Sequence, residues 1–356
     1  MIPPDALMEQ PIPLRNPLLS YLGHMPTFED IHLTRATNSK PTEPAYYHQI
    51  FERGIDPDAD DPSKLNDHSE LPDVFLCLED ILQYREHVKA RIMALYESET
   101  PYTDRCIGRA LWIGFEHEGG FELTIGFSDE LSNIGHHDLE SDDGPNRFFE
   151  REPYEITVPP IKAQGRPVSN GEYAKYLADV KEPQIPATWS KTRDARSDEE
   201  YTTFVARHTG ACLPTLHELR SIQEYVERRR KAPDGKVNHQ FHTDPKAIYV
   251  DLSDTNSGFQ NFHPMGITHK DDLCGLSDTG GAAEWTRTLF APQPGCKPMD
   301  IYPGYSADFM DQKHLAVVGG SWALHPRIAG RKSFLNWWQK KYLWPWVTFR
   351  LVRDIE

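Results

Sequence analysis

The densest group of possible metal ligands in the sequence is an acidic cluster in residues 54–72. It consists of Asp56, Asp58, Asp60 and Asp61 in the stretch GIDPDADDPSKLNDHSELP. Carboxylates this close together could bind a divalent cation, but the glycine and the terminal glutamate of an EF-hand calcium loop are missing from their places. Because the stretch is also rich in turn formers, we expect a solvated surface loop rather than a cation site.

The cysteines and the isolated histidines carry less chemical information. Five cysteines, an odd number, are widely spaced without a CxxC pair, which predicts neither a disulfide framework nor a cysteine zinc site. His24 on its own fits a packed core histidine as well as a ligand. The pair His136 and His137 lies in an acidic stretch before Asp142 and Asp143, and we expect it in an exposed loop.

Composition and charge exclude several classes of protein. The 356 residues suffice for about two domains, and 38% hydrophobic residues with eight tryptophans can fill their cores. The formal net charge of −16 opposes binding to nucleic acid and to anionic membranes. No apolar run reaches the about 18 residues of a membrane span, and no signal peptide is recognisable. We expect a soluble, cytoplasmic protein without nucleic-acid or membrane partners.

Two kinds of pattern divide the chain. Residues 78–96 and 104–118 have apolar side chains at three- and four-residue spacings, which predicts two amphipathic helices of a bundle. From Pro153 on, short apolar runs alternate with turn formers, which predicts a mixed, loop-rich domain. The fold class expected for the whole chain is therefore α+β.

Capping residues predict two helices within the second part. Ser169 and Asn170 precede a helical pattern with Glu172 in its first turn. Thr215 precedes another, and Glu218 stands three residues later as its capping-box partner.

Longer motifs in the first third resemble a known domain. PLRNPLLSYLGHMPTFEDIHLTRA, YYHQIFERGIDPDADDP, DHSELPD and ALWIGFEHE are similar to the DinB-like helical domain of the fungal-type ergothioneine-biosynthesis sulfoxide synthases. In that family three histidines hold a non-heme iron, two of them four residues apart on one helical face. The resemblance implies that His24 and His117 are metal ligands for Fe(2+). The third position is Phe121, which has no lone pair, and Gly119 and Gly120 weaken the helix before it.

Motifs of the second part resemble the formylglycine-generating-enzyme-like (sulfatase-modifying-factor) domain, a C-type-lectin-like fold. They are PVSNGEYAKYL, GACLPTLHELRSIQEYVE, GLSDTGGAAEWT, VVGGSW and FRLVRD. The resemblance implies an incomplete DinB-like domain in residues 1–121 and the second domain in residues 122–356. Cysteine oxidation of the formylglycine-generating kind is excluded, because residues 319–354 contain no cysteine.

The resemblance also implies substrate and catalytic residues. In the sulfoxide synthases a tyrosine near the metal takes part in proton transfer, and Tyr305 is the predicted counterpart, with Tyr302 left open as its neighbour. Asn336 and Trp337 match positions that hold hercynine, where an aromatic face can attract a trimethylammonium group. Arg53 is a candidate for binding the carboxylate of the thiol substrate.

A structural calcium ion, Ca(2+), is a further prediction from related domains. Asp278 and Glu284 in GLSDTGGAAEWT are its candidate ligands.

The function implied by the resemblance is oxygen-dependent C–S bond formation. An iron(II)-dependent oxidoreductase of the hercynine oxygenase type joins cysteine or γ-glutamylcysteine to hercynine, so its partners are small molecules and O2. The alternative is a non-catalytic paralogue that keeps the substrate pocket but has lost the iron site at Phe121. A truncated gene product is a third possibility, which the sequence does not separate from the second.

Overall fold

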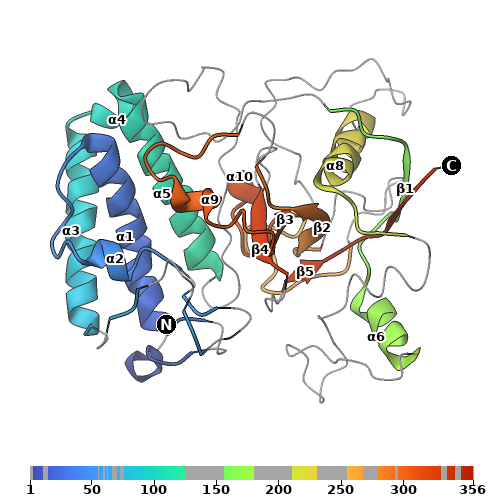
Figure 1. Cartoon of the computed structure of the whole chain (residues 1–356), viewed down its shortest axis with the longest axis horizontal. Helices are drawn as coiled ribbons and strands as arrows, with labels where there is room; N and C mark the ends of the chain where they lie inside the picture. The colour runs from blue at the N-terminus through green and yellow to red at the C-terminus, as the bar shows by residue number, and fades with distance from the viewer. Residues whose placement is uncertain are drawn as a thin grey trace. The chain divides into compact units, whose positions relative to one another are not determined.

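The chain forms two compact units, each of which is built from more than one segment of the sequence. The computed structural model describes residues 3–10, 15–54, 56–58, 61, 63–65, 70–72, 76–124, 156–179, 211–230, 255–267, 280–292, 296–329, 335–340 and 346–355. The first unit contains the described residues up to 124 together with 297–307, and the second contains the others. Helices and strands are both present (Figure 1), which confirms the α+β class.

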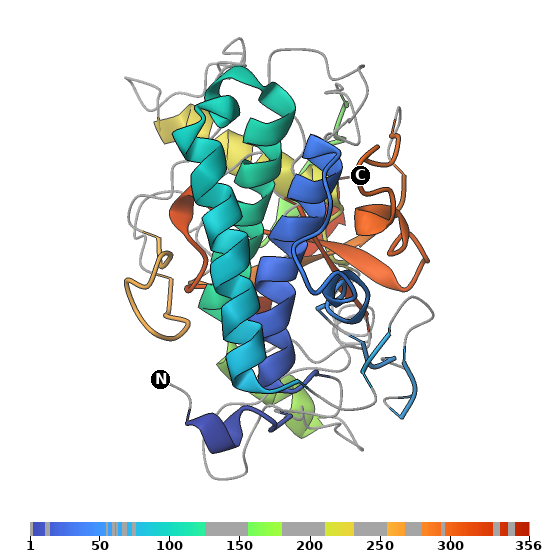
Figure 2. The same cartoon turned by 90° about the vertical axis from the view of Figure 1, so that its left-hand side faces the viewer.

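Three long helices form the first unit. They are α1 (Leu18–Thr37), α3 (Leu78–Glu97) and α5 (Arg105–Thr124), and α1 packs against both of the others. Figure 2 looks onto these helices, which lie side by side. The short elements of the unit are η1 (Pro4–Ala6), α2 (Tyr47–Ile50), α4 (Thr100–Thr103) and α9 (Gly304–Ala307).

The two helices predicted in this part are confirmed. Residues 78–96 lie in α3 and residues 104–118 in α5, which continues to Thr124. Gly119 and Gly120 thus lie within α5. A glycine weakens a helix by about 1 kcal/mol, which does not prevent a helix from forming.

The core of the helical unit lies between α1, α2 and α3. Its buried side chains come from all three helices and the segments beside them: Leu7, Leu19, Tyr47, Phe51, Ile81, Tyr84 and Val88. Ile81 and Val88 of residues 78–96 thus face this core, as the periodicity predicts, whereas Leu82 is 43% exposed.

A buried carboxylate crosslinks these helices. Asp30 on α1 has a side chain with 0% exposure and accepts hydrogen bonds from Arg91 Nη1 of α3 at 2.6 Å and from His48 Nε2 of α2 at 2.7 Å. The backbone N and the hydroxyl of Thr42 donate to it at 2.8 and 2.6 Å. Burial would raise the pKa of Asp30, but the hydrogen bonds from His48 and Thr42 and the charge of Arg91 outweigh it and hold the pKa below its usual range.

The predicted loop in residues 54–72 contains no helix in its described residues. The prediction of a solvated acidic cluster is wrong for Asp56, which is 2% exposed and accepts a hydrogen bond from Asn16 Nδ2 at 2.6 Å. A second bond from the same amide reaches the backbone O of Gly54 at 3.3 Å. Asp56 thus ties the loop to the start of α1 and faces no solvent.

The second unit is built around a four-stranded sheet with the order β4-β3-β2-β5. β2 (Ala283–Leu289) and β3 (His314–Val318) are antiparallel, as are β3 and β4 (Asn336–Gln339), whereas β5 (Val347–Thr348) is parallel to β2. β1 (Ile161–Ala163) and β6 (Val352–Asp354) form a separate antiparallel pair. The helices are α6 (Asn170–Asp179), α8 (Leu216–Arg230) and α10 (Pro326–Ala329).

Both predicted helix starts are confirmed as capping boxes. Before α6, the Glu172 backbone N donates to Ser169 Oγ at 3.3 Å and the Ser169 backbone N donates to Glu172 Oε2 at 2.9 Å. Before α8, Thr215 and Glu218 make the same reciprocal bonds at 3.1 and 2.6 Å. Each pair satisfies backbone donors that a helix start leaves open.

The contacts of Glu284 do not support the predicted calcium site. Its carboxylate is 1% exposed, and both of its oxygens accept hydrogen bonds from the buried guanidinium of Arg350, one of them from Nη2 at 3.0 Å. The guanidinium already neutralises this carboxylate, so a second cation on it would be repelled. Asp278 lies outside the described residues.

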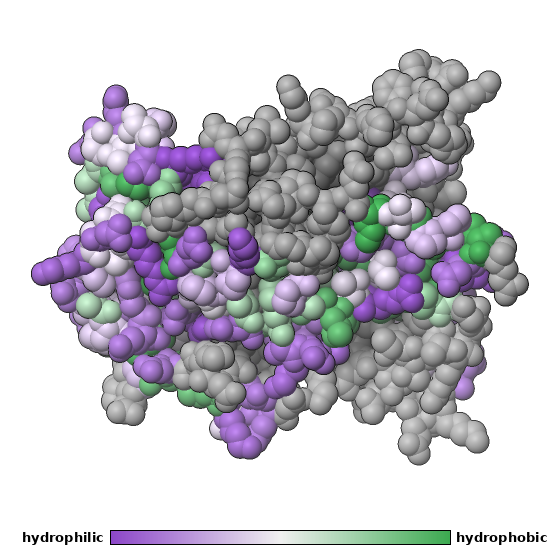
Figure 3. Space-filling view, turned by 45° about the horizontal axis from the view of Figure 1, so that its top comes forward, coloured by the Kyte–Doolittle hydropathy of each residue, from purple (hydrophilic) through white to green (hydrophobic). Residues whose placement is uncertain are grey.

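One face of the molecule shows how hydrophilic and hydrophobic residues are distributed on the surface. On the face drawn in Figure 3, hydrophilic residues predominate over the helical unit and hydrophobic residues are scattered among them. None of the helices that the structure describes is long and apolar enough to cross a membrane.

The Asp30 network predicts a large loss of stability when its charge is removed. Asp30→Asn leaves Arg91 without its buried partner, which should lower the free energy of unfolding by about 3–5 kcal/mol in urea titrations. Because the folded pKa of Asp30 is lowered, its contribution is complete above its unfolded pKa of about 3.9 and is lost as the pH falls through the folded value. The variant should therefore lose less stability than wild type as the pH falls below about 4.

Asp61→Asn is the matched control, because Asp61 pairs with Lys64 at 2.7 Å on the surface. It should leave the urea midpoint unchanged. Equal midpoints for Asp30→Asn and Asp61→Asn would contradict the importance of the network.

Candidate functional site

One face of α1 carries four side chains of the candidate site. His24, Phe28, His32 and Arg35 follow one another at three- and four-residue spacings, which places them along one side of the helix. His24 and His32 are buried, with 3% and 0% exposure. The packing of α1 against α5 adds His117, which is 1% exposed.

The structure brings the two predicted metal ligands together. Nε2 of His24 and Nε2 of His117 are 3.2 Å apart, and the two rings meet edge to face with their centres 5.0 Å apart. His24 Nδ1 lies 2.7 Å from the backbone O of Phe51. Since a carbonyl oxygen only accepts, Nδ1 of His24 carries the hydrogen and Nε2 has the lone pair that faces His117.

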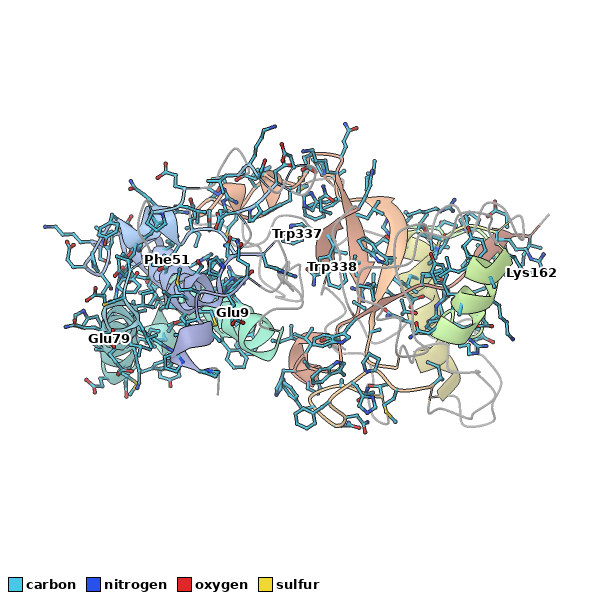
Figure 4. The ribbon with its side chains drawn as sticks, turned by 90° about the horizontal axis from the view of Figure 1, so that it is seen from below. Glu9, Phe51, Glu79, Lys162, Trp337 and Trp338 are labelled. Atoms are coloured by element: carbon cyan, nitrogen blue, oxygen red, sulfur yellow. The ribbon has the colours of Figure 1, made fainter. Side chains whose placement is uncertain are left out.

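Close packing fixes the carbonyl that orients His24. A Cβ on Gly23 would lie 2.5 Å from Cζ of Phe51, so only glycine at this position admits the Phe51 ring. Phe51 is itself a buried core residue, labelled among the helices in Figure 4. The Asn16 bonds to Gly54 and Asp56 fix the chain just beyond it.

His117 is held by an aromatic stack. Its ring lies on Phe28 with the centres 3.5 Å apart and the planes 6° from parallel. Phe28 also packs on His32 at 4.3 Å, and His32 Nδ1 donates to the backbone O of Phe28 at 2.9 Å. The Phe28 ring therefore lies between the imidazoles of His32 and His117 and sets the plane of the His117 ring.

The histidines of this site are neutral at physiological pH. Burial lowers the pKa of His24 to about 4 and that of His32 to about 4, and it lowers the pKa of His117 well below the ordinary value. The nearby charge of Arg53 lowers the His24 pKa further. Neutral imidazole is the form that binds metal ions.

Tyr302, which the sequence left open beside Tyr305, lies in the same unit as these histidines. It is 5% exposed, and its ring centre is 5.6 Å from that of His32. Burial raises the pKa of Tyr302 well above its usual value, the charge of Glu52 raises it further, and the charge of Arg53 opposes the rise. Arg53 is half-buried and thus acts electrostatically on both His24 and Tyr302.

Two predicted positions have side chains outside the described part of the structure. Tyr305 belongs to α9 and Phe121 to α5, and only their backbone is described. His136 and His137 lie outside the described residues altogether.

In the second unit, the predicted hercynine residues begin β4. Asn336 is 0% exposed and its Oδ1 accepts from the backbone N of Trp337 at 3.2 Å. Its Nδ2 has no acceptor in the part of the chain that the structure describes. A buried amide donor without a partner costs about 1–3 kcal/mol, which an acceptor on a ligand would recover.

Trp337 and Trp338 are consecutive residues of β4, so their side chains lie on opposite faces of the sheet. Trp337 stacks on Phe290 with the centres 4.5 Å apart and the planes 12° from parallel, so one of its faces is covered. Trp338 meets Trp285 edge to face at 5.7 Å. Trp337 also packs on Phe309 with the ring centres 5.9 Å apart and is 4% exposed, so its ring is enclosed by aromatic side chains.

The histidine pair fits two adjacent positions of a metal ion. Nitrogens 3.2 Å apart subtend about 100° at an ion about 2.1 Å from each of them. Within the described residues, however, no group of three His, Cys, Asp or Glu side chains could hold a metal. The arrangement thus supplies two nitrogen ligands and leaves the remaining positions to other groups.

Sequence reasoning missed the roles of Phe28, His32 and Arg35. The signal was present in the spacing 24, 28, 32 and 35, which is one helical face in GHMPTFEDIHLTRA. The nearness of Tyr302 had no such signal, because residues 297–307 are more than 250 positions away from this face in the sequence.

The curated relatives of the chain indicate one family. No protein-family profile matches the chain. Ergothioneine biosynthesis protein 1 of Neurospora crassa is 33% identical over 487 residues, which cover 100% of this chain and 56% of that protein. Hercynine oxygenase of Mycobacterium tuberculosis is 26% identical over 230 residues, which cover 53% of this chain and 51% of that protein. The solved structure of PvdO from Pseudomonas aeruginosa is similar at a TM-score of 0.39 and 14% identity, over 63% of this chain and 90% of that one.

The chain spans about half the length of the curated relatives it matches. The stretch of 487 positions shared with the Neurospora protein is also 131 longer than the 356 residues of this chain. That relative therefore has residues within the stretch that have no counterpart here.

The packing of Phe51 against Gly23 yields a prediction about His24. Gly23→Ala should displace the Phe51 ring and its carbonyl, lower the free energy of unfolding by about 1–3 kcal/mol, and expose His24. Exposure would be measured as modification of His24 by diethyl pyrocarbonate, read by mass spectrometry.

Two variants control this experiment. Gly266→Ala adds a methyl group with nothing within 4 Å and should change neither readout. Adding Phe51→Leu to Gly23→Ala makes room for the methyl group and should restore protection of His24. Full protection in Gly23→Ala alone would show that the Phe51 carbonyl does not orient this histidine.

Proposed function

We propose that this chain, which belongs to the ergothioneine-biosynthesis sulfoxide synthase family, forms a C–S bond between a cysteine-type thiol and hercynine or a related imidazole. The reaction would use O2 and a non-heme iron. The observation that carries the proposal is the pair of buried, neutral histidines with their Nε2 atoms 3.2 Å apart. A sulfur and oxygen chemistry of this kind needs a redox metal, and imidazole is a suitable ligand for ferrous iron. The chain is proposed to act in the cytoplasm.

We propose that the two units correspond to a shortened DinB-like domain and a formylglycine-generating-enzyme-like domain. The three long helices of the first unit and the loop-rich sheet of the second support this assignment.

His24 and His117 would hold the iron. Bound iron would supply the activation of O2 and a binding position for the thiolate. The Phe51 carbonyl keeps His24 in the tautomer that offers Nε2, and Phe28 keeps the His117 ring in the plane that faces it. Both side chains are buried and neutral, so neither has to lose a net proton, and His117 binds a metal through Nε2 once its hydrogen is on Nδ1.

The other side chains of the first unit would handle the thiol and a proton. Arg53 is proposed to bind the substrate carboxylate through its forked donors, next to His24, whose pKa its charge lowers. Of the two candidate tyrosines, the contacts favour Tyr302, whose raised pKa keeps its hydroxyl protonated and able to donate a hydrogen. Tyr305 remains the alternative.

In the second unit, Asn336 is proposed to donate from Nδ2 to hercynine. Trp337 would contribute its indole ring to the contact with the trimethylammonium group.

A non-catalytic paralogue is the competing function. The same 3.2 Å separation suits a direct hydrogen bond, in which His117 Nε2 donates to His24 Nε2 with no metal between them. Iron binding separates the two readings.

Wild-type protein should retain substoichiometric ferrous iron after anaerobic reconstitution and desalting, because only two ligands are supplied. His24→Ala and His117→Ala should each remove the residual iron. Phe121→His places a third imidazole four residues after His117 on α5 and should raise occupancy about tenfold or more. Iron would be measured by elemental analysis, and C–S product by mass spectrometry with cysteine, hercynine and O2.

Phe115→His is the matched control, since Phe115 is 47% exposed on the same helix. It should leave occupancy at the wild-type level. Stoichiometric iron in the wild type would mean that another residue already fills the third position. Complete absence of iron, even in Phe121→His, would favour the paralogue.

Hercynine should bind without iron if the second-unit assignment is right. Calorimetry at millimolar ligand should detect binding to the wild type and a loss of about 2–10-fold in affinity for Asn336→Ala, the value of one hydrogen bond. Gln339→Ala, at the other end of β4, is the control and should bind like wild type. The assignment of Asn336 fails if both variants bind equally well.

A further inference from the structure

Arg35 makes three contacts that link distant parts of the chain. Its Nη1 donates to the backbone O of Ile301 at 3.0 Å, and its guanidinium carbon lies 4.5 Å from the centre of the Tyr302 ring. Its Nη2 lies 3.9 Å from Oε1 of Glu52. Arg35 stands in the last turn of α1, whereas Ile301 and Tyr302 belong to residues 297–307. One side chain thus joins this late segment to the first long helix.

The three contacts use different parts of the guanidinium. One nitrogen serves the carbonyl, another faces the carboxylate, and the flat face covers the phenol ring. The pair with Glu52 is partly exposed and contributes little by itself. Ile301 and Tyr302, by contrast, are 6% and 5% exposed, so the partners of the carbonyl bond and of the ring contact are buried beneath the partly exposed Arg35. A lysine could keep the charge but not all three contacts.

A continuous row of rings leads from the histidine pair to this contact. His117 stacks on Phe28, Phe28 packs on His32, and His32 packs on Tyr302 with ring centres 3.5, 4.3 and 5.6 Å apart. The first three rings are held by α1 and α5. Tyr302 is the only member of the row from residues 297–307, so its place depends on what holds that segment.

We propose that Arg35 is a positioning residue that anchors residues 297–307 on α1 and thereby fixes the Tyr302 ring at the end of this row. The anchoring is a property of the folded chain and needs neither metal nor substrate. Its consequence for turnover rests on the proposed function, in which the Tyr302 hydroxyl donates a hydrogen.

Hydrogen exchange on the full chain tests the anchoring without any activity. In Arg35→Met, backbone amides of residues 297–307 should exchange about tenfold faster than in wild type, and Arg35→Lys should fall between the two. Arg353→Met, an exposed arginine of β6, should match wild type. The α3 peptides are the internal reference. Unchanged exchange in residues 297–307, or equal acceleration in α3, would overturn the proposal, the latter because it reports a general loss of stability.

A double-mutant cycle tests whether Arg35 acts through Tyr302. Arg35→Met should lower kcat for C–S product about tenfold while changing the KM for the thiol less than about twofold. In a Tyr302→Phe background it should cause no further loss. Losses that multiply fully in the double variant would overturn the positioning role. If wild type makes no C–S product, the proposed function fails, and the exchange experiment alone decides the anchoring.

Discussion

The helical unit depends on one buried charge, the carboxylate of Asp30. A carboxylate with no access to water is tolerated only when its oxygens are fully bonded and its charge is balanced. Arg91, His48 and Thr42 meet this need, and they come from α3, α2 and the turn after α1. The requirement fixes the rotation of α1 about its axis, because Asp30 must face these partners. With that rotation set, the face carrying His24, Phe28 and His32 can only point towards α5.

Water exclusion is the second constraint on the site. His24, His117 and Tyr302 are each at most 5% exposed, and burial shifts the pKa of each towards the neutral form. Electrostatic interactions gain strength in such surroundings, so the half-buried Arg53 influences both a histidine and a tyrosine. The site therefore offers the lone pairs of neutral imidazoles and a protonated tyrosine hydroxyl, with the positive charge of Arg53 beside them.

Sequence reasoning succeeded where local chemistry decides structure. The helices of residues 78–96 and 104–118 follow from their apolar spacing, and the caps at Ser169 and Thr215 follow from side-chain reach. The prediction of a solvated side chain failed for Asp56, because a turn-rich stretch does not reveal a hydrogen-bond donor such as Asn16, which lies 40 residues earlier in the sequence. The prediction of a calcium ligand lacks support at Glu284 for the same reason, since its partner Arg350 lies 66 residues later, between β5 and β6. His24 and His117 were predicted as metal ligands through family motifs, because two isolated histidines have no spacing that points to a metal site.

The membership of residues 297–307 in the helical unit has a consequence for how the chain folds. During synthesis, α1, α3 and α5 are complete long before Ile301 and Tyr302 leave the ribosome. His32 and Arg35 on α1 must therefore remain without their contacts to Ile301 and Tyr302 until most of the second unit has been synthesised. Contacts of such high sequence separation form late and slow the completion of the fold. The site is thus assembled last, from a helix made early and a tyrosine made near the end.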